Sequence, residues 1–384
     1  MKPPFHPLIG LGIGCLLATD PAQGRPSVIN RIAEADVQTE AATFQVVQVA
    51  QGLEHPWAIA FLTGDQILIT ERPGRLWRIE GDVIVPIQGL PEIRAQGQGG
   101  LLDVIPHPSF PENRVIYLSY SATYRGGAGT RIARAILDQD HLRDLEVIFE
   151  MNPPGNGPVH FGSRFAFDRH GYLFVTLGER GDRDLSQRLD THHGKVIRIH
   201  DDGRIPADNP FVDRKDAKPE IYSFGHRNQQ GMVYDTRTGI LWAHEHGPRG
   251  GDALHIIRPG LNYGWPLATY GREYFGPRIG TTPELIEDIV NPTLHWTPSI
   301  APSGLALLQS DNFPGWEGNL FAGALIQQHI RRIVLEGTGV VHQEELLRNR
   351  FGRIRDVRQG PDGNLWFITD DPNGGLFRIQ SVAD

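Results

Sequence analysis

One two-strand pattern recurs six times along this 384-residue chain. Each copy has a short apolar segment, a turn with glycine or charge, and a second segment that often ends in Arg-Ile. The paired segments are 66–70 with 74–79, 114–119 with 130–137, 172–177 with 194–199, 239–243 with 253–257, 319–325 with 329–335, and 364–369 with 375–379. Several copies begin at an Asp-Gly type of turn, such as Asp362-Gly363, which is a strong hairpin signal. The recurrence indicates a repeat architecture.

We predict an all-β fold, a six-bladed β-propeller. A lone hairpin would leave an apolar face and strand edges uncovered, whereas radial repetition buries the faces and leaves only short edges. The 45 Gly and 29 Pro suit many short strands joined by turns. A pair of two-sheet sandwiches is the competing fold, but it does not explain six copies of one hairpin type. Only 215–221 and 343–348 are candidate helices, and both are short.

The N-terminus has the pattern of an export signal. Lys2 supplies a positive charge, 8–18 is an apolar run, and small residues near 24 suit cleavage. We therefore expect a signal peptide at 1–24, a flexible lead-in at 25–43 and a propeller catalytic domain at 44–384. The apolar run is too short to span a bilayer, so we expect a periplasmic or secreted protein. The formal net charge of -8 argues against a nucleic-acid partner.

Arginines and amides in loops indicate a binding site for an anion. Arg227 and Asn228 lie in one loop, and Arg353 and Arg355 lie near the C-terminus. The planar guanidinium group binds carboxylates through two parallel hydrogen bonds. Because a propeller gathers the loops of all its blades around one end of its axis, these distant residues can face one pocket.

Three further loops carry candidate chemistry. His160 is a candidate general base, since a neutral loop histidine in a cleft can accept a proton. Gln98 lies in a glycine-rich loop that lets the backbone approach a flat ligand. The turn at Gly247-Pro248 and the backbone of Tyr263 offer carbonyl oxygens, which calcium accepts. Nucleophile-elbow and dinucleotide-binding motifs are absent, which disfavours nucleophilic hydrolysis and NAD-dependent hydride transfer.

From residue 55 onward the chain resembles the soluble, pyrroloquinoline quinone (PQQ)-dependent glucose and aldose sugar dehydrogenases, which are six-bladed propellers. The matching motifs are Gln98-Gly99-Gly100-Leu101-Leu102, His160-Phe161-Gly162, Leu177-Gly178-Glu179, Gly225-His226-Arg227-Asn228-Gln229-Gln230-Gly231, Gly247-Pro248, Asn262-Tyr263-Gly264-Trp265-Pro266, Ala301-Pro302-Ser303-Gly304 and Arg353-Ile354-Arg355-Asp356-Val357. They cover most of the chain in the family's order.

The resemblance implies roles for the candidate residues. His160 would be the general base at the anomeric hydroxyl of the sugar, with Arg227 as the second catalytic candidate. The residues expected to hold PQQ are Gln98, Arg227, Asn228, Arg353 and Arg355. The carbonyls of Gly247 and Pro248 would bind a calcium ion at the cofactor, and that of Tyr263 a second, structural calcium ion.

Two positions depart from the family pattern. Ala253 stands where the structural calcium site has a glutamate, which puts that second site in doubt. Ile326 stands where some members have a lysine that contacts the cofactor, so we expect weaker PQQ retention or compensation by another base such as Arg180.

The expected function is PQQ- and calcium-dependent oxidation of the C1 hydroxyl of aldose sugars to lactones, with electrons passed to a soluble or quinone acceptor. A monomer or weak homodimer is expected. The alternatives are a dehydrogenase of a related aldehyde or sorbosone-like substrate, a propeller sugar-binding module without catalysis, and a calcium-dependent lactonase. The loops do not identify which sugar is used.

Overall fold

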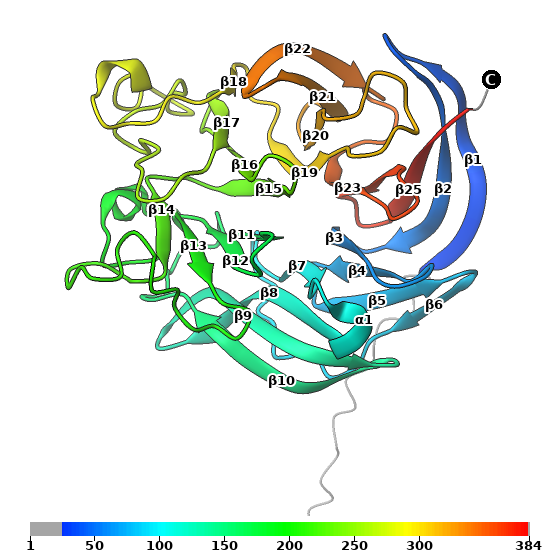
Figure 1. Ribbon diagram of the computed structural model, residues 1–384, viewed down its shortest axis with the longest axis horizontal. Helices are drawn as coiled ribbons and strands as arrows, with labels where there is room; N and C mark the ends of the chain where they lie inside the picture. The colour runs from blue at the N-terminus through cyan, green and yellow to red at the C-terminus, as the bar shows by residue number, and fades with distance from the viewer. Residues whose placement is uncertain (1–24, 383–384) are drawn as a thin grey trace, which may run out of the picture.

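The computed structural model describes residues 25–382, so the expected signal peptide at 1–24 lies outside the described residues. Six antiparallel sheets are arranged in a ring (Figure 1). The first strand of each sheet contacts the first strand of the next, so these inner strands surround the central axis. The protein is a six-bladed β-propeller, as predicted.

Five blades have four strands in chain order, and a sixth, which we call the closing blade, has five. Blade 1 contains β3 (Pro56–Phe61), β4 (Ile67–Glu71), β5 (Arg75–Glu80) and β6 (Val83–Pro86). Blade 2 contains β7 (Leu101–Pro106), β8 (Val115–Tyr124), β9 (Gly127–Asp138) and β10 (His141–Glu150). Blade 3 contains β11 (Gly162–Phe167), β12 (Leu173–Leu177), β13 (Lys195–Ile199) and β14 (Ile221–Phe224). Blade 4 contains β15 (Gln229–Asp235), β16 (Ile240–Glu245), β17 (Asp252–Ile256) and β18 (Leu294–Trp296). Blade 5 contains β19 (Pro302–Leu307), β20 (Leu320–Ala324), β21 (His329–Glu336) and β22 (Gly339–Leu346). The closing blade contains β23 (Ile354–Gln359), β24 (Leu365–Thr369), β25 (Gly374–Ser381), β2 (Thr43–Leu53) and β1 (Ser27–Gln38).

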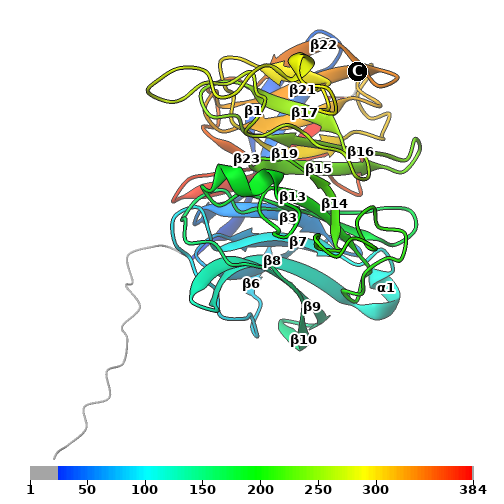
Figure 2. The ribbon, with the colours of Figure 1, turned by 90° about the vertical axis from the view of Figure 1, so that its left-hand side faces the viewer.

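The six expected hairpins are the middle strand pairs of the blades. They are the pairs β4–β5, β8–β9, β12–β13, β16–β17, β20–β21 and β24–β25, all antiparallel. Beside each pair lies an inner strand that the repeat pattern did not reveal. The side view places inner strands β3, β7, β15 and β19 near the middle of the molecule (Figure 2). These strands are buried on both faces, and so lack the alternation of a half-exposed strand.

Both helix predictions are wrong. Segment 343–348 lies largely in β22, and 215–221 forms turns that lead into β14. Pairing with β21 orders residues 343–346 as a strand, which overrides local propensity. In 215–221, only Ile221 pairs with a neighbouring strand. The helical elements among residues 25–382 are α1 (Phe110–Asn113) and the 3₁₀ turns η1 (Arg183–Gln187) and η2 (Pro283–Leu285). Nowhere in that range does a helix reach the length and apolar character needed to cross a membrane.

The two ends of the chain meet in the closing blade. β2 pairs with β25, and β1 pairs with β2 as the outermost strand (Figure 1). The prediction of a flexible lead-in at 25–43 is therefore wrong, because most of this segment is an ordered edge strand. Most β1 side chains are wholly or partly exposed, so its composition is polar although its backbone is paired. The propeller begins near Ser27 rather than at residue 44.

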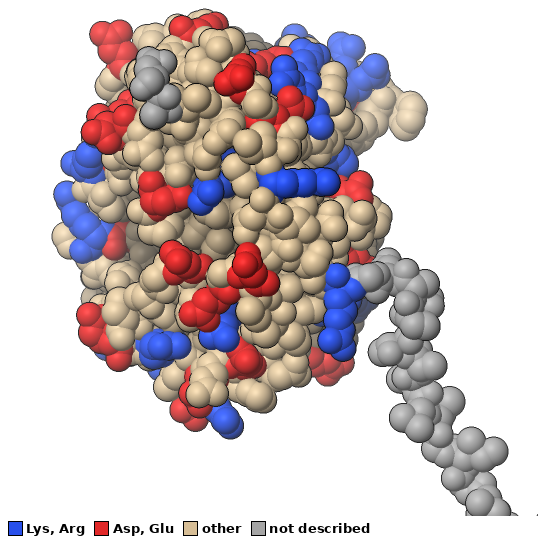
Figure 3. All heavy atoms as spheres, turned by 90° about the vertical axis from the view of Figure 1, so that its right-hand side faces the viewer, with Lys and Arg blue, Asp and Glu red and all other residues tan. Residues whose placement is uncertain are grey.

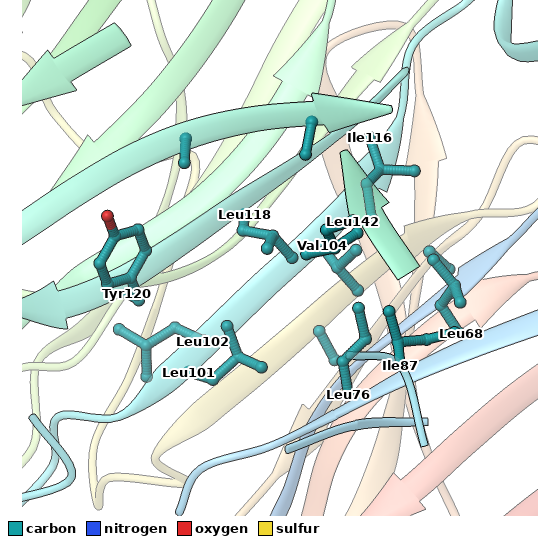
Figure 4. Close-up of a cluster of buried hydrophobic side chains, with 14 of the residues drawn as sticks. Leu68, Leu76, Ile87, Leu101, Leu102, Val104, Ile116, Leu118, Tyr120 and Leu142 are labelled. Atoms are coloured by element: carbon teal, nitrogen blue, oxygen red, sulfur yellow. The ribbon is translucent and has the colours of Figure 1, made fainter. Parts of the chain in front are cut away.

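Apolar side chains fill the spaces between neighbouring blades. In the cluster drawn in Figure 4, side chains from blades 1 and 2 point toward one another. Its labelled members are Leu68, Leu76, Ile87, Leu101, Leu102, Val104, Ile116, Leu118, Tyr120 and Leu142. Burial at this scale, worth about 1.5–3 kcal/mol for each large side chain, holds the blades at fixed positions and thereby fixes their loops.

Four charged side chains, which we call the axial cluster, lie among the inner strands: Asp103, Arg164 and Asp356 are buried, and Arg358 is 18% exposed. The Arg164 guanidinium lies 3.4 Å from an Asp103 oxygen and 3.2 Å from an Asp356 oxygen. Arg358 binds the same two carboxylates at 2.9 and 3.0 Å. Because blade 3 and the closing blade stand opposite each other in a ring of six, the contact from Arg164 to Asp356 crosses the axis.

Candidate functional site

A cleft opens where the inner strands begin, with an empty volume of about 750 Å³ that includes its open mouth. All six inner strands, or the residue just before them, contribute lining residues: Trp57, Leu102, Gly162, Gln230, Ala301 and Arg355. The structure brings four of the expected cofactor-binding residues together at this cleft: Gln98, Asn228, Arg353 and Arg355. Residues from widely separated parts of the chain thus share one site.

The ionisable side chains of the cleft are mostly cationic. Arg353 and Arg355 both bind the same oxygen of Asp370, at 3.1 and 2.8 Å. Burial raises the pKa of Asp370, but Arg355 and the other bonded neighbours outweigh it, so the pKa lies well below its ordinary value and the group is ionised. Arg72 adds a third guanidinium. On the face in Figure 3 both signs of charge are interspersed.

Two of these charged residues were missed by sequence reasoning. Asp370 directly follows the expected strand 364–369. Arg72 lies in the turn of the first expected hairpin. Both positions are strand ends at the mouth of a propeller, which is the only signal that could have identified them.

His160 lies beside the cleft and is held in a fixed orientation. Its Nδ1 atom lies 2.7 Å from an oxygen of Glu179, and its backbone N–H donates to the Gln98 side-chain oxygen at 2.8 Å. Burial lowers the pKa of His160, with Glu179 opposing that effect. The imidazole is therefore neutral at pH 7, with Nδ1–H donated to Glu179 and the Nε2 lone pair free to accept a proton. The two residues that follow it, Phe161 and Gly162, line the cleft.

The loop that carries His160 depends on a close approach between two segments. A Cβ atom at Gly178 would lie 2.0 Å from the His160 carbonyl oxygen, so only glycine fits between the histidine and Glu179. His160 itself has a φ of 54°, an uncommon conformation for a non-glycine residue. Glu179 was noticed in the sequence only as part of a motif, since its contact with His160 forms across a loop.

Arg180 stabilises the loop that carries His160 by contacts with its backbone and with Phe161. Its guanidinium lies 3.4 Å from the centre of the Phe161 ring and donates to the carbonyls of Val159 and Ala128 at 2.9 and 3.0 Å. The expectation that Arg180 replaces a missing cation in the pocket is wrong, because backbone carbonyls occupy its donors and it does not line the cleft. Ile326 does line the cleft and adds no charge there.

A smaller pocket, with an empty volume of about 360 Å³, adjoins the cleft and shares His246 with it. Arg227, Gly247 and Tyr263 line this pocket rather than the cleft. The Arg227 guanidinium donates to the Gly247 carbonyl at 3.0 Å, and its Nε atom is buried without a hydrogen-bond partner. Pro248 lines neither of these two cavities.

Carboxylates near the Gly247 turn are already bonded. Asp252 accepts hydrogen bonds from the backbone N–H groups of Gly247, Ile300 and Ala301 at 2.8–2.9 Å. Ala253 lines the smaller pocket without a carboxylate. Across residues 25–382, we find no group of three or more His, Cys, Asp or Glu side chains placed to hold a metal ion. A hard cation at this turn would depend on carbonyl oxygens.

The fold and the cleft define a propeller protein with an arginine-rich cleft at one end of its central axis. Residues 53–378 match the family model described as Glucose / Sorbosone dehydrogenase, and the chain belongs to this family of oxidoreductases.

Named relatives agree with this assignment. The chain is 42% identical to the aldose sugar dehydrogenase YliI of Escherichia coli over 88% of this chain and 93% of the relative. The apo form of the soluble aldose sugar dehydrogenase of E. coli superimposes with a TM-score of 0.85, at 41% identity, over 88% of this chain and all of that one. The PQQ-bound aldose sugar dehydrogenase of Streptomyces coelicolor superimposes with a TM-score of 0.72, at 26% identity, over 94% of this chain and all of that one.

Proposed function

We propose that this protein is a PQQ- and calcium-dependent dehydrogenase that oxidises the C1 hydroxyl of aldose sugars to lactones. The observation that carries the proposal is the charge of the cleft, whose lining has three guanidinium groups and a single carboxylate. PQQ is a flat quinone with three carboxylates, and such an anion offsets a surplus of cations. The family assignment and the PQQ-bound relative support the same cofactor.

The donors of the cleft fit a flat, polyanionic ligand. The Nε atom of Arg355 is buried without a hydrogen-bond partner in the described part of the chain, so it has a donor to offer. Arg353, Arg355 and the Asn228 and Gln98 side chains would hold PQQ. When bound, PQQ supplies the group that accepts a hydride from the sugar carbon.

In this proposal His160 removes the proton of the sugar C1 hydroxyl through Nε2. Glu179 holds the other ring nitrogen, keeps the required tautomer and stabilises the imidazolium that forms. Arg227 lies beside the Gly247 turn, where its charge would favour an anionic ligand.

Calcium would bind through the Gly247 and Pro248 carbonyls, which are suitable hard-cation ligands. The Gly247 oxygen accepts one hydrogen bond from Arg227 and keeps a second lone pair. We do not extend the proposal to a second calcium ion at Tyr263. The carboxylate in that pocket, Glu245, already accepts the Arg227 backbone N–H at 2.5 Å and lies 3.4 Å from His255.

Related functions differ in substrate or in catalysis. A sorbosone-like aldehyde substrate would use the same cleft, and the family name includes such enzymes. A sugar-binding module without catalysis is less favoured, because it would not need the His160–Glu179 pair. A lactonase is also less favoured, because its calcium site would need carboxylates. We further propose export guided by 1–24 and electron transfer to a soluble or quinone acceptor.

Reconstitution of the apo protein tests the proposed function. We expect dye reduction by an aldose only when PQQ and calcium are both added, because the cleft provides binding groups but no redox group of its own. A dye-coupled assay over a panel of aldoses and aldehydes measures this and identifies the sugar class. Absence of PQQ binding at micromolar concentrations, measured by titration calorimetry with calcium present, would exclude the proposal.

Arg353→Ala should weaken PQQ binding by about 10- to 100-fold, the loss expected for a charge-assisted hydrogen bond. Because the Arg353 side chain is 44% exposed, the thermal midpoint should change little. Calorimetric titration of apo protein measures the affinity. Arg350→Ala is the matched control, since Arg350 binds Glu34 on the closing blade and does not line the cleft. Equal affinities for the two variants would contradict the placement of Arg353.

A further inference from the structure

Arg72 differs from the other arginines of the cleft in having no carboxylate partner. Arg353 and Arg355 share Asp370, whereas Arg72 forms no ion pair with any residue in 25–382. The single hydrogen bond of its side chain in that range goes from Nη1 to the Gly97 carbonyl oxygen at 3.2 Å. A guanidinium group has five N–H donors, so most of its donors have no protein acceptor.

The backbone of Arg72 is held firmly at the cleft wall. Its N–H donates to the His55 carbonyl, and its carbonyl accepts from the Leu101 N–H, both at 3.1 Å. A Cβ atom at Gly100 would lie 1.9 Å from the Arg72 carbonyl oxygen, so this approach requires glycine. Segments before and after blade 1 thus fix the base of the side chain, which lowers the entropy cost of placing its charge on a ligand.

The charge of Arg72 is incompletely balanced in this structure. Burial lowers its pKa, Asp370 opposes that effect, and the like charges of Arg355 and Arg353 lower it further. The guanidinium nevertheless stays charged at neutral pH, because arginine loses its proton only in strongly alkaline solution. Three positive groups around one carboxylate repel one another, and an added anion relieves that repulsion.

We propose that Arg72 binds a carboxylate of PQQ and is a third cationic ligand of the cofactor, beside Arg353 and Arg355. The inference rests on the proposed function and assigns a further residue to it. The cofactor's three carboxylates and the three guanidinium groups then match in number. A purely structural role, in which Arg72 only holds the Gly97 loop and through it Gln98, is the competing explanation.

The experiment is a calorimetric titration of PQQ into the full-length apo protein with calcium present. The unmodified chain is compared with Arg72→Met, which removes the charge, Arg72→Lys, which keeps the charge without the fork, and Arg94→Met as a control. Arg94 binds Gln96 and Thr123 near the same loop and does not line the cleft, so it matches the loss of one nearby charge. Each titration is repeated at several salt concentrations, because a lost ligand ion pair reduces the salt dependence of binding.

We expect Arg72→Met to weaken PQQ binding by about 10- to 100-fold and to reduce its salt dependence. The PQQ affinity of Arg72→Lys should lie between those of Arg72→Met and the unmodified chain. The PQQ affinity of Arg94→Met should stay within about twofold of that of the unmodified chain. The inference is overturned if Arg72→Met binds PQQ within about twofold of the unmodified chain. The inference is also overturned if Arg72→Met weakens PQQ binding without changing its salt dependence, which is the result expected for a structural role. An equal loss of PQQ affinity in Arg94→Met would overturn it as well. Failure of the unmodified chain to bind PQQ would remove the proposed function itself.

Discussion

Replacing His160 with alanine should reduce sugar oxidation by about 10²–10⁴-fold and leave PQQ affinity within about threefold of the original. The proposed role of this imidazole is proton removal, and the groups proposed to hold the cofactor lie elsewhere in the cleft. Turnover by the reconstituted enzyme and calorimetric PQQ affinity measure the two effects separately. His170→Ala is the control, since His170 is an exposed turn residue of blade 3. An unchanged turnover number would remove His160 from the proposed mechanism.

Glu179→Gln tests how Glu179 affects the pKa of His160. Glu179 raises the pKa of His160 against the larger effect of burial, so loss of its charge lowers that pKa further. The neutral imidazole then persists to lower pH, and the acid limb of the kcat/KM profile should move downward. Because a weaker base accepts the proton less readily, the rate at neutral pH should fall. An acid limb that moves upward would contradict the assignment of this limb to His160.

Arg164→Met should destabilise the propeller by about 3–5 kcal/mol, the usual cost of removing one member of a buried charge group. Arg164 is 1% exposed and lies against two fully buried aspartates, Asp103 and Asp356, which would lose a cationic partner. It also donates to the Gln230 carbonyl at 2.7 Å and lies 4.0 Å from the centre of the Trp57 ring. Since both of these residues line the cleft, PQQ affinity should fall as well.

Urea denaturation of the full chain measures this loss of stability as a shift of the unfolding midpoint. Arg214→Met is the matched control, because Arg214 forms an exposed pair with Asp216 and such solvated pairs contribute little to stability. If the two variants unfolded at the same urea concentration, the axial cluster would not be a major source of stability.

The architecture could be predicted from the sequence because each blade repeats one local signal. Turns such as Asp362-Gly363 and the Arg-Ile strand ends mark the middle hairpin of a blade, and these features depend only on neighbouring residues. The edge strand at Ser27–Gln38 was missed because its pairing partner, rather than its own composition, orders it. The inner strands were missed because the repeated turn and Arg-Ile signals mark only the middle hairpin of each blade.

The candidate site was predictable in part. Residue type marked Arg353 and Arg355 as candidate anion ligands, because a guanidinium group suits carboxylates, and the structure places both at the cleft. Asp370, Arg72 and Glu179 could not be identified in this way. Each is an ordinary charged residue at a strand end, and its importance comes from a neighbour on another segment that only the folded ring brings within hydrogen-bond distance.

The sharing of the closing blade between the two ends of the chain has a consequence for the order of folding. Phe44 in β2 pairs with Ser381 in β25, so β2 gains this partner only after residue 381 has left the ribosome. Contacts so distant along the chain form slowly. Arg353, Arg355 and Asp370 all lie in this last sheet or its connecting loops. A partly synthesised chain therefore has neither a closed ring nor its main cationic wall, and the arginine-rich cleft is complete only when the final strand is in place.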